Sequence, residues 1–139
     1  MKVGTWVIKI IPIYKALSNW KPFEAYAVER LLSENQNKAC VIDFGAGHSV
    51  YEDAALFQRV RHALTPYPNT ILLLPSPNLE QSVEILNKRN NYIADGSLNI
   101  NEHFVRHPSN FQLAKFTVYT QNKTPEETCC EILALLDLR

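Results

Sequence analysis

Thr70–Leu74 reads TILLL and is apolar after its first residue. A strand with one face in water alternates polar and apolar side chains, whereas a strand of a parallel sheet is covered on both faces. Two other short segments are predicted strands, namely Ala39–Phe44 (ACVIDF), an apolar run between polar residues, and Phe116–Tyr119 (FTVY). Together they predict buried strands of one parallel sheet.

Helical patterns separate these strands. Ser76-Pro77 offers an N-cap and a first-turn proline, and Thr124–Glu127 is a capping box that opens a last helix. Apolar residues recur at helical spacing between the strands. The predicted helices, with their inward-facing residues, are Pro22–Glu34 (Ala27, Val28, Leu31, Leu32), a second with Leu56, Phe57, Val60 and Leu64, a third with Leu79, Val83 and Leu86, a short one with Ile100, Phe104 and Val105, and the last with Ile132, Leu133 and Leu136.

Strands that alternate with amphipathic helices indicate a parallel sheet with helices on both faces. No repeat, low-complexity tract or linker divides the 139 residues. We therefore predict a single α/β domain over residues 1–139, with a three-layer arrangement.

The N-terminal segment Met1–Tyr14 (MKVGTWVIKIIPIY) is predicted to contribute a further strand, because Val3–Ile11 is rich in β-branched and aromatic residues. A signal anchor is the alternative, since Lys2 precedes an apolar stretch. Lys9 and Pro12 interrupt that stretch, and no run approaches the length of a membrane span.

Composition limits the classes of partner. Fourteen Lys and Arg balance fourteen Asp and Glu, and 46% of the residues are hydrophobic. A dedicated nucleic-acid binder or polybasic membrane binder would carry a net basic surface, so neither partner is expected. Three cysteines form no secreted disulfide framework. A cytoplasmic protein with a small-molecule partner is the expectation.

The first candidate site follows the predicted strand that ends near Asp43. A carboxylate at this end of a buried strand can hold magnesium through water or orient a hydroxyl, which makes Asp43 a candidate catalytic residue. Gly45 and Gly47 would let backbone amides approach an anion closely. A tight turn whose aspartate caps the next segment is the alternative.

The second candidate is a basic excursion over residues 88–110. It holds Lys88, Arg89, His103, Arg106 and His107 against two acidic residues. Guanidinium groups grip phosphate oxygens, so a lid that closes over a phosphate is one interpretation. A solvated loop, with an exposed stretch at Asn90–Ser97, is the other.

Histidines and cysteines complete the inventory. His48, His62, His103 and His107 lack acidic or cysteine partners at the spacing of metal ligands, so no metal site is expected. Cys129 and Cys130 are neighbours in the last predicted helix, where successive side chains point about 100° apart. One of the two is therefore expected in the core and the other at the surface.

The order of these features from about Lys38 to Leu136 resembles the C-terminal two-thirds of shikimate kinase and its relatives among the P-loop small-molecule kinases. The matched order is strand, Gly45-Ala46-Gly47 turn, helix, strand, helix ending at Lys88-Arg89, basic excursion, Arg106-x-Pro108, strand and helix. The resemblance implies a P-loop-kinase-like sheet that is incomplete at its N-terminus.

The resemblance also implies residue roles. Gly45, Ala46 and Gly47 would lie beside the substrate, as the family's glycine triplet does. Arg106 would bind a substrate carboxylate, and Arg89 would be the lid arginine that contacts the nucleotide and acts in catalysis. Ala46 replaces the middle glycine of the family, and the aromatic residue expected soon after Pro108 appears only as Phe111.

The nucleotide half of the family pattern is missing. No G-x-x-x-x-G-K-[ST] occurs, and Gly4 is the sole glycine before Gly45. The acidic pair of the family's second strand is also absent, since Tyr14–Leu32 reads as loop and helix. ATP and Mg²⁺ are expected only if that half is supplied, and no efficient kinase activity is expected.

A missing P-loop strand would leave a gap in the sheet, because in the family it lies between the third and fourth strands. We expect Val3–Ile11 to fill this gap or to pair with another copy. Three functions stay open. The first is a truncated, catalytically degenerate kinase relative or a fragment of a longer ATP-binding protein. The second is a non-catalytic binding module that forms a homodimer or completes its sheet with a partner, and the third is an enzyme of different chemistry that uses Asp43, His48 and Arg106.

Overall fold

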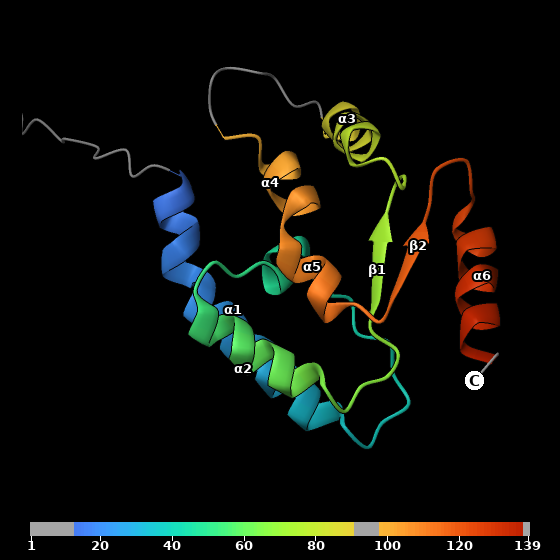
Figure 1. Cartoon of the computed structure of the whole chain (residues 1–139). Helices are drawn as coiled ribbons and strands as arrows, with labels where there is room; N and C mark the ends of the chain where they lie inside the picture. The colour runs from blue at the N-terminus through green and yellow to red at the C-terminus, as the bar shows by residue number, and fades with distance from the viewer. Residues whose placement is uncertain (1–12, 91–97, 138–139) are drawn as a thin grey trace, which may run out of the picture.

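The computed structural model describes residues 13–90 and 98–137 of the chain. At its centre lie two parallel strands, β1 (Ile71–Leu74) and β2 (Phe116–Tyr119), with Ile71 opposite Phe116 and Leu74 opposite Tyr119. The strands predicted at Thr70–Leu74 and Phe116–Tyr119, and their parallel pairing, are therefore confirmed. Figure 1 shows the strands between α6 (Pro125–Asp137) and the other helices.

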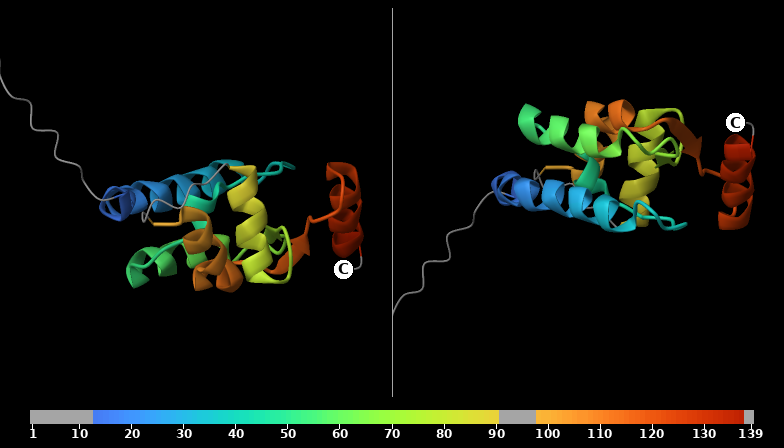
Figure 2. Two further views of the ribbon diagram at one scale, coloured as in Figure 1. Left: turned by 90° about the horizontal axis from the view of Figure 1, so that it is seen from above. Right: turned by 90° about the horizontal axis from the view of Figure 1, so that it is seen from below.

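Helices make up most of the described chain, which is a mixed α/β fold. In every view, α6 and the N-terminal end of α1 lie at opposite extremes of the molecule (Figure 2). The elements between them are α1 (Ile13–Asn35), the 3₁₀ helix η1 (Ala46–Ser49), α2 (Ala54–Leu64), α3 (Leu79–Arg89), α4 (Ile100–Arg106) and α5 (Pro108–Leu113).

Side-chain caps fix where the helices begin. The Asp53 carboxylate accepts a hydrogen bond from the Leu56 amide at 2.9 Å and starts α2. Thr124 and Glu127 each accept the other's amide, so the predicted capping box is confirmed. Such caps satisfy amides that have no partner inside the helix.

The predicted start of α3 at Ser76-Pro77 is wrong. Asn78 is the N-cap, and its side chain accepts from the Gln81 amide. Ser76 is buried, and its hydroxyl instead donates to the Gln81 side chain and accepts from the Asn78 amide. Pro77 therefore lies in the turn before the helix, because the asparagine two residues later competes successfully for the cap position.

α1 is longer than its sequence pattern predicted. The helix begins at Ile13 and contains Pro22 in its interior, whereas the prediction placed Pro22 in the first turn. An interior proline removes one backbone hydrogen bond and costs about 3 kcal/mol. Burial of Ala25, Val28 and Leu32 along the same helix offsets that cost. The predicted strand at Met1–Tyr14 cannot include its last two residues, and Met1–Pro12 lies outside the described residues.

One apolar core joins α1 to α2. It contains Ala25, Val28 and Leu32 from α1, Val60 and Leu64 from α2, and also Tyr51 and Leu113. At the surface of this helix pair the Arg59 guanidinium donates two hydrogen bonds to the Glu29 carboxylate, at 2.9 and 2.6 Å. This bidentate pair lowers the pKa of Glu29 and fixes the two helices side by side.

A second core covers one face of the sheet. Leu74, Val83 and Val105 are its buried members and bring β1, α3 and α4 together. Side chains alternate along a strand, so Leu73 and Val118 point to the opposite face. Val118 is fully buried, whereas Leu73 is 52% exposed. The second face is thus covered over β2, which α6 contacts, and open over β1.

The strand predicted at Ala39–Phe44 is not formed. These residues have no strand pairing, and the described sheet contains β1 and β2 alone. Ile42 and Phe44 pack against the α1–α2 core, whereas Val41 is 98% exposed. Apolar composition predicted burial on both faces, but only one face of this segment has a neighbour within the described chain.

The last helix is also less buried than predicted. Cys129 and Cys130 are both exposed, and Leu133, expected to face inward, is 53% exposed. α6 packs along β2 with Thr128 as its buried residue, so one sheet strand covers only a narrow stripe of the helix. Among residues 13–90 and 98–137, no helix has the length and apolar character that crossing a bilayer requires.

Candidate functional site

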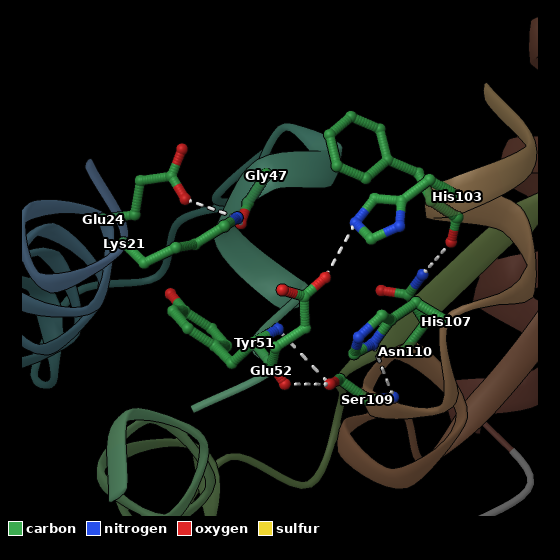
Figure 3. Close-up of polar contacts among 10 residues, drawn as sticks. Lys21, Glu24, Gly47, Tyr51, Glu52, His103, His107, Ser109 and Asn110 are labelled. Atoms are coloured by element: carbon green, nitrogen blue, oxygen red, sulfur yellow. Dashed lines mark hydrogen bonds and ion pairs between the residues drawn. The ribbon is translucent and has the colours of Figure 1, made fainter. Parts of the chain in front are cut away.

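Polar groups from three parts of the chain meet beside η1. Lys21 and Glu24 come from α1, Gly47 and Tyr51 from η1 and the segment after it, and His103 and Ser109 from α4 and α5 (Figure 3). This group is called the η1 site below. It lies where the turn after residues 39–44 meets the segment that begins with Arg106.

Lys21 ties α1 to η1. Its Nζ donates to the Gly47 carbonyl oxygen and to Glu24 Oε2, each at 2.7 Å. The same ammonium lies 5.5 Å from the centre of the Tyr51 ring, within the range of a cation–π contact. A Cβ atom at Gly47 would come within 2.8 Å of Glu24 Oε1. Glycine at this position therefore allows the close approach of η1 to the lysine–glutamate pair.

Tyr51 brings a neutral phenol to the site. The residue is 4% exposed, and its hydroxyl has no hydrogen-bond partner within the described part of the chain. Burial, followed by the charges of Glu24 and Glu29, raises the pKa of this phenol far above its ordinary value of 10.0. The hydroxyl thus stays protonated and can both donate and accept. His48 Nδ1 is a second buried polar atom without a partner among these residues.

The Ser109 hydroxyl joins the two sides of the site. Its Oγ donates to the Tyr51 carbonyl oxygen at 3.2 Å and accepts from the Tyr51 amide at 3.4 Å, although the residues are 58 apart in sequence. Ser109 is 3% exposed. One hydroxyl therefore satisfies both backbone groups of Tyr51 and holds the segment after η1 against α5.

Two histidines line the α4–α5 side. His103 Nε2 lies 3.5 Å from Glu52 Oε1, and the His103 and His107 rings meet edge-on with centroids 5.5 Å apart. His107 Nδ1 accepts the Ser109 amide at 3.3 Å and caps α5. Burial, and then repulsion from His103, lowers the pKa of His107. The lowered pKa keeps His107 neutral near pH 7, so its Nδ1 can accept the Ser109 amide.

The predicted anion turn takes a helical form. Gly45, Ala46 and Gly47 open η1, and the Gly45 carbonyl accepts the His48 amide at 2.9 Å. Gly45 has φ −60° and ψ 155°, values open to any residue. Asp43 is exposed in the coil before η1. Of these two glycines, Gly47 is the one that the Glu24 side chain approaches closely.

The two predicted arginines are not brought together. Arg106 lies at the end of α4, with Nε 3.2 Å from Glu102 Oε1 and NH2 3.7 Å from Glu80 Oε1 on α3. Arg89 follows Glu80 by nine positions on the same helix, which is about 14 Å along the axis at 1.5 Å per residue. Arg106 therefore lies at one end of α3 and Arg89 at the other.

The described part of the basic excursion is packed. Asn101, Val105, Ser109 and Asn110 are buried, and the predicted short helix is confirmed as α4. Residues 91–97 of the excursion lie outside the described residues. Within the described ranges no group of three or more His, Cys, Asp or Glu is placed to hold a metal ion. His62 is exposed on α2.

No family model, curated protein or solved structure matches this chain. The site must therefore be interpreted from its own geometry. Sequence patterns did not single out Lys21, Glu24, Tyr51, Glu52 or Ser109 for this site. The Lys21–Glu24 spacing of three was a usable helical signal, but nothing in the sequence indicated that Ser109 would bond to Tyr51.

Ser109→Ala should destabilise the protein by about 1–3 kcal/mol, because it leaves the buried amide and carbonyl of Tyr51 without their partner. Urea unfolding measures this change. Ser33→Ala, at an exposed position on α1, should stay within about 0.5 kcal/mol of the wild type. Equal stability of the two variants would contradict the bridging role of Ser109.

Stability should also depend on pH through His107, whose pKa in the folded protein lies below the ordinary 6.5. The unfolded chain then binds the proton more readily, so the stabilisation is complete above the unfolded pKa and is lost as pH falls through the folded one. We expect the urea concentration at the unfolding midpoint to decrease as the pH is lowered from about 7.5 to about 5.5. His107→Gln should reduce this dependence of the urea midpoint on pH, whereas His62→Gln, at an exposed position, should not. The same dependence on pH in the wild type and both variants would contradict the role of His107.

Proposed function

We propose that this chain is a catalytically degenerate relative of the P-loop small-molecule kinases that retains the substrate side of the fold and binds a small hydroxylated carboxylic acid. The observation that carries the proposal is the bond between Ser109 and Tyr51. It joins the Gly45–Gly47 turn region to the Arg106-x-Pro108 segment. In the family that the sequence resembles, both motifs border the substrate.

The order of elements supports the same assignment. The turn at residues 45–49 is followed by a helix, a strand, a helix ending at Arg89, a helical segment with Arg106, a parallel strand and a last helix. From the turn onward this is the order on which the resemblance to shikimate kinase rests, whereas the strand that precedes the turn in that order is not formed. Parallel pairing of β1 with β2 agrees with an α/β sheet of this kind.

The η1 site offers groups suited to such a ligand. The Tyr51 hydroxyl and His48 Nδ1 are buried polar atoms beside the site with no hydrogen-bond partner within the described chain. Arg106 is a cationic group paired with Glu102 at the protein surface, and the His103 ring lies 3.5 Å from Glu52. Exposed ion pairs of this type contribute little, so a ligand carboxylate can compete with the glutamates.

Phosphoryl transfer is not part of the proposed activity. Positioning and charge neutralisation of the phosphates supply nearly all of that catalysis. The sequence has no P-loop to provide them. ATP with Mg²⁺ would bind productively only if a nucleotide half were supplied, and then Arg89 and Asp43 would be the residues available for the lid and the metal.

Titration with shikimate tests the proposal by the amide shifts of Gly47 and Tyr51 in ¹⁵N-labelled protein. We expect saturable shifts, and Arg106→Ala should weaken binding about tenfold by removing the charge-assisted bond to the carboxylate. Arg89→Ala, at the far end of α3, is the matched control and should bind normally. Flat titrations, or equal losses in both variants, would exclude this function.

A self-associating module is the second candidate, and the aromatic face of α1 favours it. Trp20, Phe23 and Tyr26 are 63%, 65% and 57% exposed on the side of α1 away from the core. The exposed Arg30 lies further along the same helix. A second copy fits this face, since two antiparallel α1 helices related by a two-fold axis would set Arg30 of each copy against the rings of the other.

Light scattering over a range of protein concentrations tests this second function. We expect a dimer that Phe23→Ser dissociates by removing the most exposed ring. Phe111→Ser, at a position 43% exposed on α5, is the matched control and should leave the dimer intact. A monomer at every concentration would exclude self-association through α1.

A further inference from the structure

An open groove lies between the C-terminal ends of α1 and α2. Its volume is about 470 Å³, and its walls come from the last turns of the two helices and from the residues that follow each of them. No residue of the η1 site lines this groove. Small-molecule sites have volumes of roughly 300 to 1,000 Å³, so a compact ligand fits here.

The groove combines an apolar surface with uncharged polar side chains. Leu32, which is 5% exposed, contributes the apolar surface together with Ala63 and Tyr67, whereas Gln36 and Asn37 contribute side-chain amides. The Tyr67 hydroxyl donates to the Leu32 carbonyl oxygen at 2.7 Å. This bond fixes the segment after α2 against α1, so the two sides of the groove are held at a defined spacing.

The backbone makes the groove electronegative. α1 ends at Asn35 and α2 at Leu64, and both C-terminal ends lie on the same side of the helix pair (Figure 1). The last carbonyl groups of a helix have no partner within it, and together they act as about half a negative charge. α1 has no basic residue in its last turn to neutralise this charge.

Glu29 supplies the full negative charge in the lining of the groove. Its hydrogen bonds from Arg59 lower its pKa, so the carboxylate is ionised at neutral pH. Two carboxylate oxygens offer about four acceptor positions, so both can accept further bonds beside those from Arg59. Lys38, Arg61 and His62 are exposed neighbours along the chain, but none of them lines the groove.

We propose that this groove binds a small organic cation, namely an amidinium or primary ammonium group on a short apolar stem. The charged group bonds to the Glu29 carboxylate, and the stem packs against Leu32 and Tyr67. The stem is required because an exposed ion pair alone contributes little, whereas removal of apolar surface from water adds to the affinity. The proposal concerns a second ligand, opposite in charge to the one proposed for the η1 site and independent of it.

Three probes of one shape test the charge preference. Benzamidinium, benzamide and benzoate share a ring and carry a cationic, a neutral and an anionic substituent. In the ¹⁵N-labelled chain, we expect benzamidinium to give saturable shifts of the Asn37 and Tyr67 amides that weaken with added salt. Benzamide should bind about tenfold more weakly because it lacks the charge-assisted bond, and benzoate should give no saturable shift.

Two glutamates on α1 provide a matched pair of variants. Glu29→Gln should weaken benzamidinium binding about tenfold, because a neutral amide replaces the ionised acceptor. Glu34→Gln is the control, since Glu34 is also paired with an arginine, Arg30, but does not line the groove. This control should stay within about twofold of the wild type.

Arg59→Gln separates recognition of the cation from pairing of the two helices. It breaks the same ion pair as Glu29→Gln but leaves the carboxylate in the groove, so benzamidinium should bind at least as tightly as in the wild type. Loss of binding in Arg59→Gln would overturn the proposal, since helix pairing rather than Glu29 would then make the site.

The proposal would also be overturned by flat titrations with benzamidinium, by equal binding of the three probes, or by equal losses in Glu29→Gln and Glu34→Gln. A failed shikimate titration, followed at Gly47 and Tyr51, leaves these readouts unchanged.

Discussion

The hydroxyl of Ser109 is the contact on which the arrangement of this fold depends. The described chain has two apolar cores, one between α1 and α2 and one on the sheet. α5 packs against the first core, with Leu113 in it and Ser109 bonded to Tyr51, another of its members. Because backbone groups buried without partners cost free energy, these two hydrogen bonds fix how the segment after η1 meets α5.

Electrostatic compensation is the second organising feature. Three basic side chains near the η1 site have acidic neighbours: Lys21 has Glu24, His103 has Glu52, and Arg106 has Glu102 and Glu80. The Lys21 pair is half-buried and couples two elements, so it is structural. The pairs of His103 and Arg106 are more exposed and exchange more readily with a ligand. The ion pair on the α1 side of the site therefore holds the structure together, whereas the side chains on the α4 side can exchange their acidic partners for a ligand.

The errors of the sequence-based prediction share a physical cause. Val41, Leu133 and the adjacent Cys129 and Cys130 are apolar or weakly polar and were expected, at least in part, inside. In the described structure they have too few neighbours, because β1 ends the sheet on one side and α6 packs mainly against β2. Apolar composition records a preference for burial, but whether a partner surface exists is decided elsewhere in the chain.

Sequence by itself determined the elements: a continuous apolar run predicted β1, the Thr124–Glu127 box predicted the start of α6, and helical spacing predicted α2 and α4. It also determined that no P-loop is present. Only the tertiary structure decided that Ser109 meets Tyr51, that Lys21 bonds to Gly47, and that Arg89 and Arg106 lie at opposite ends of α3. The reason is sequence separation. Helix caps and hydrophobic periodicity involve residues within one or two helical turns, whereas these contacts join residues 26 and 58 positions apart.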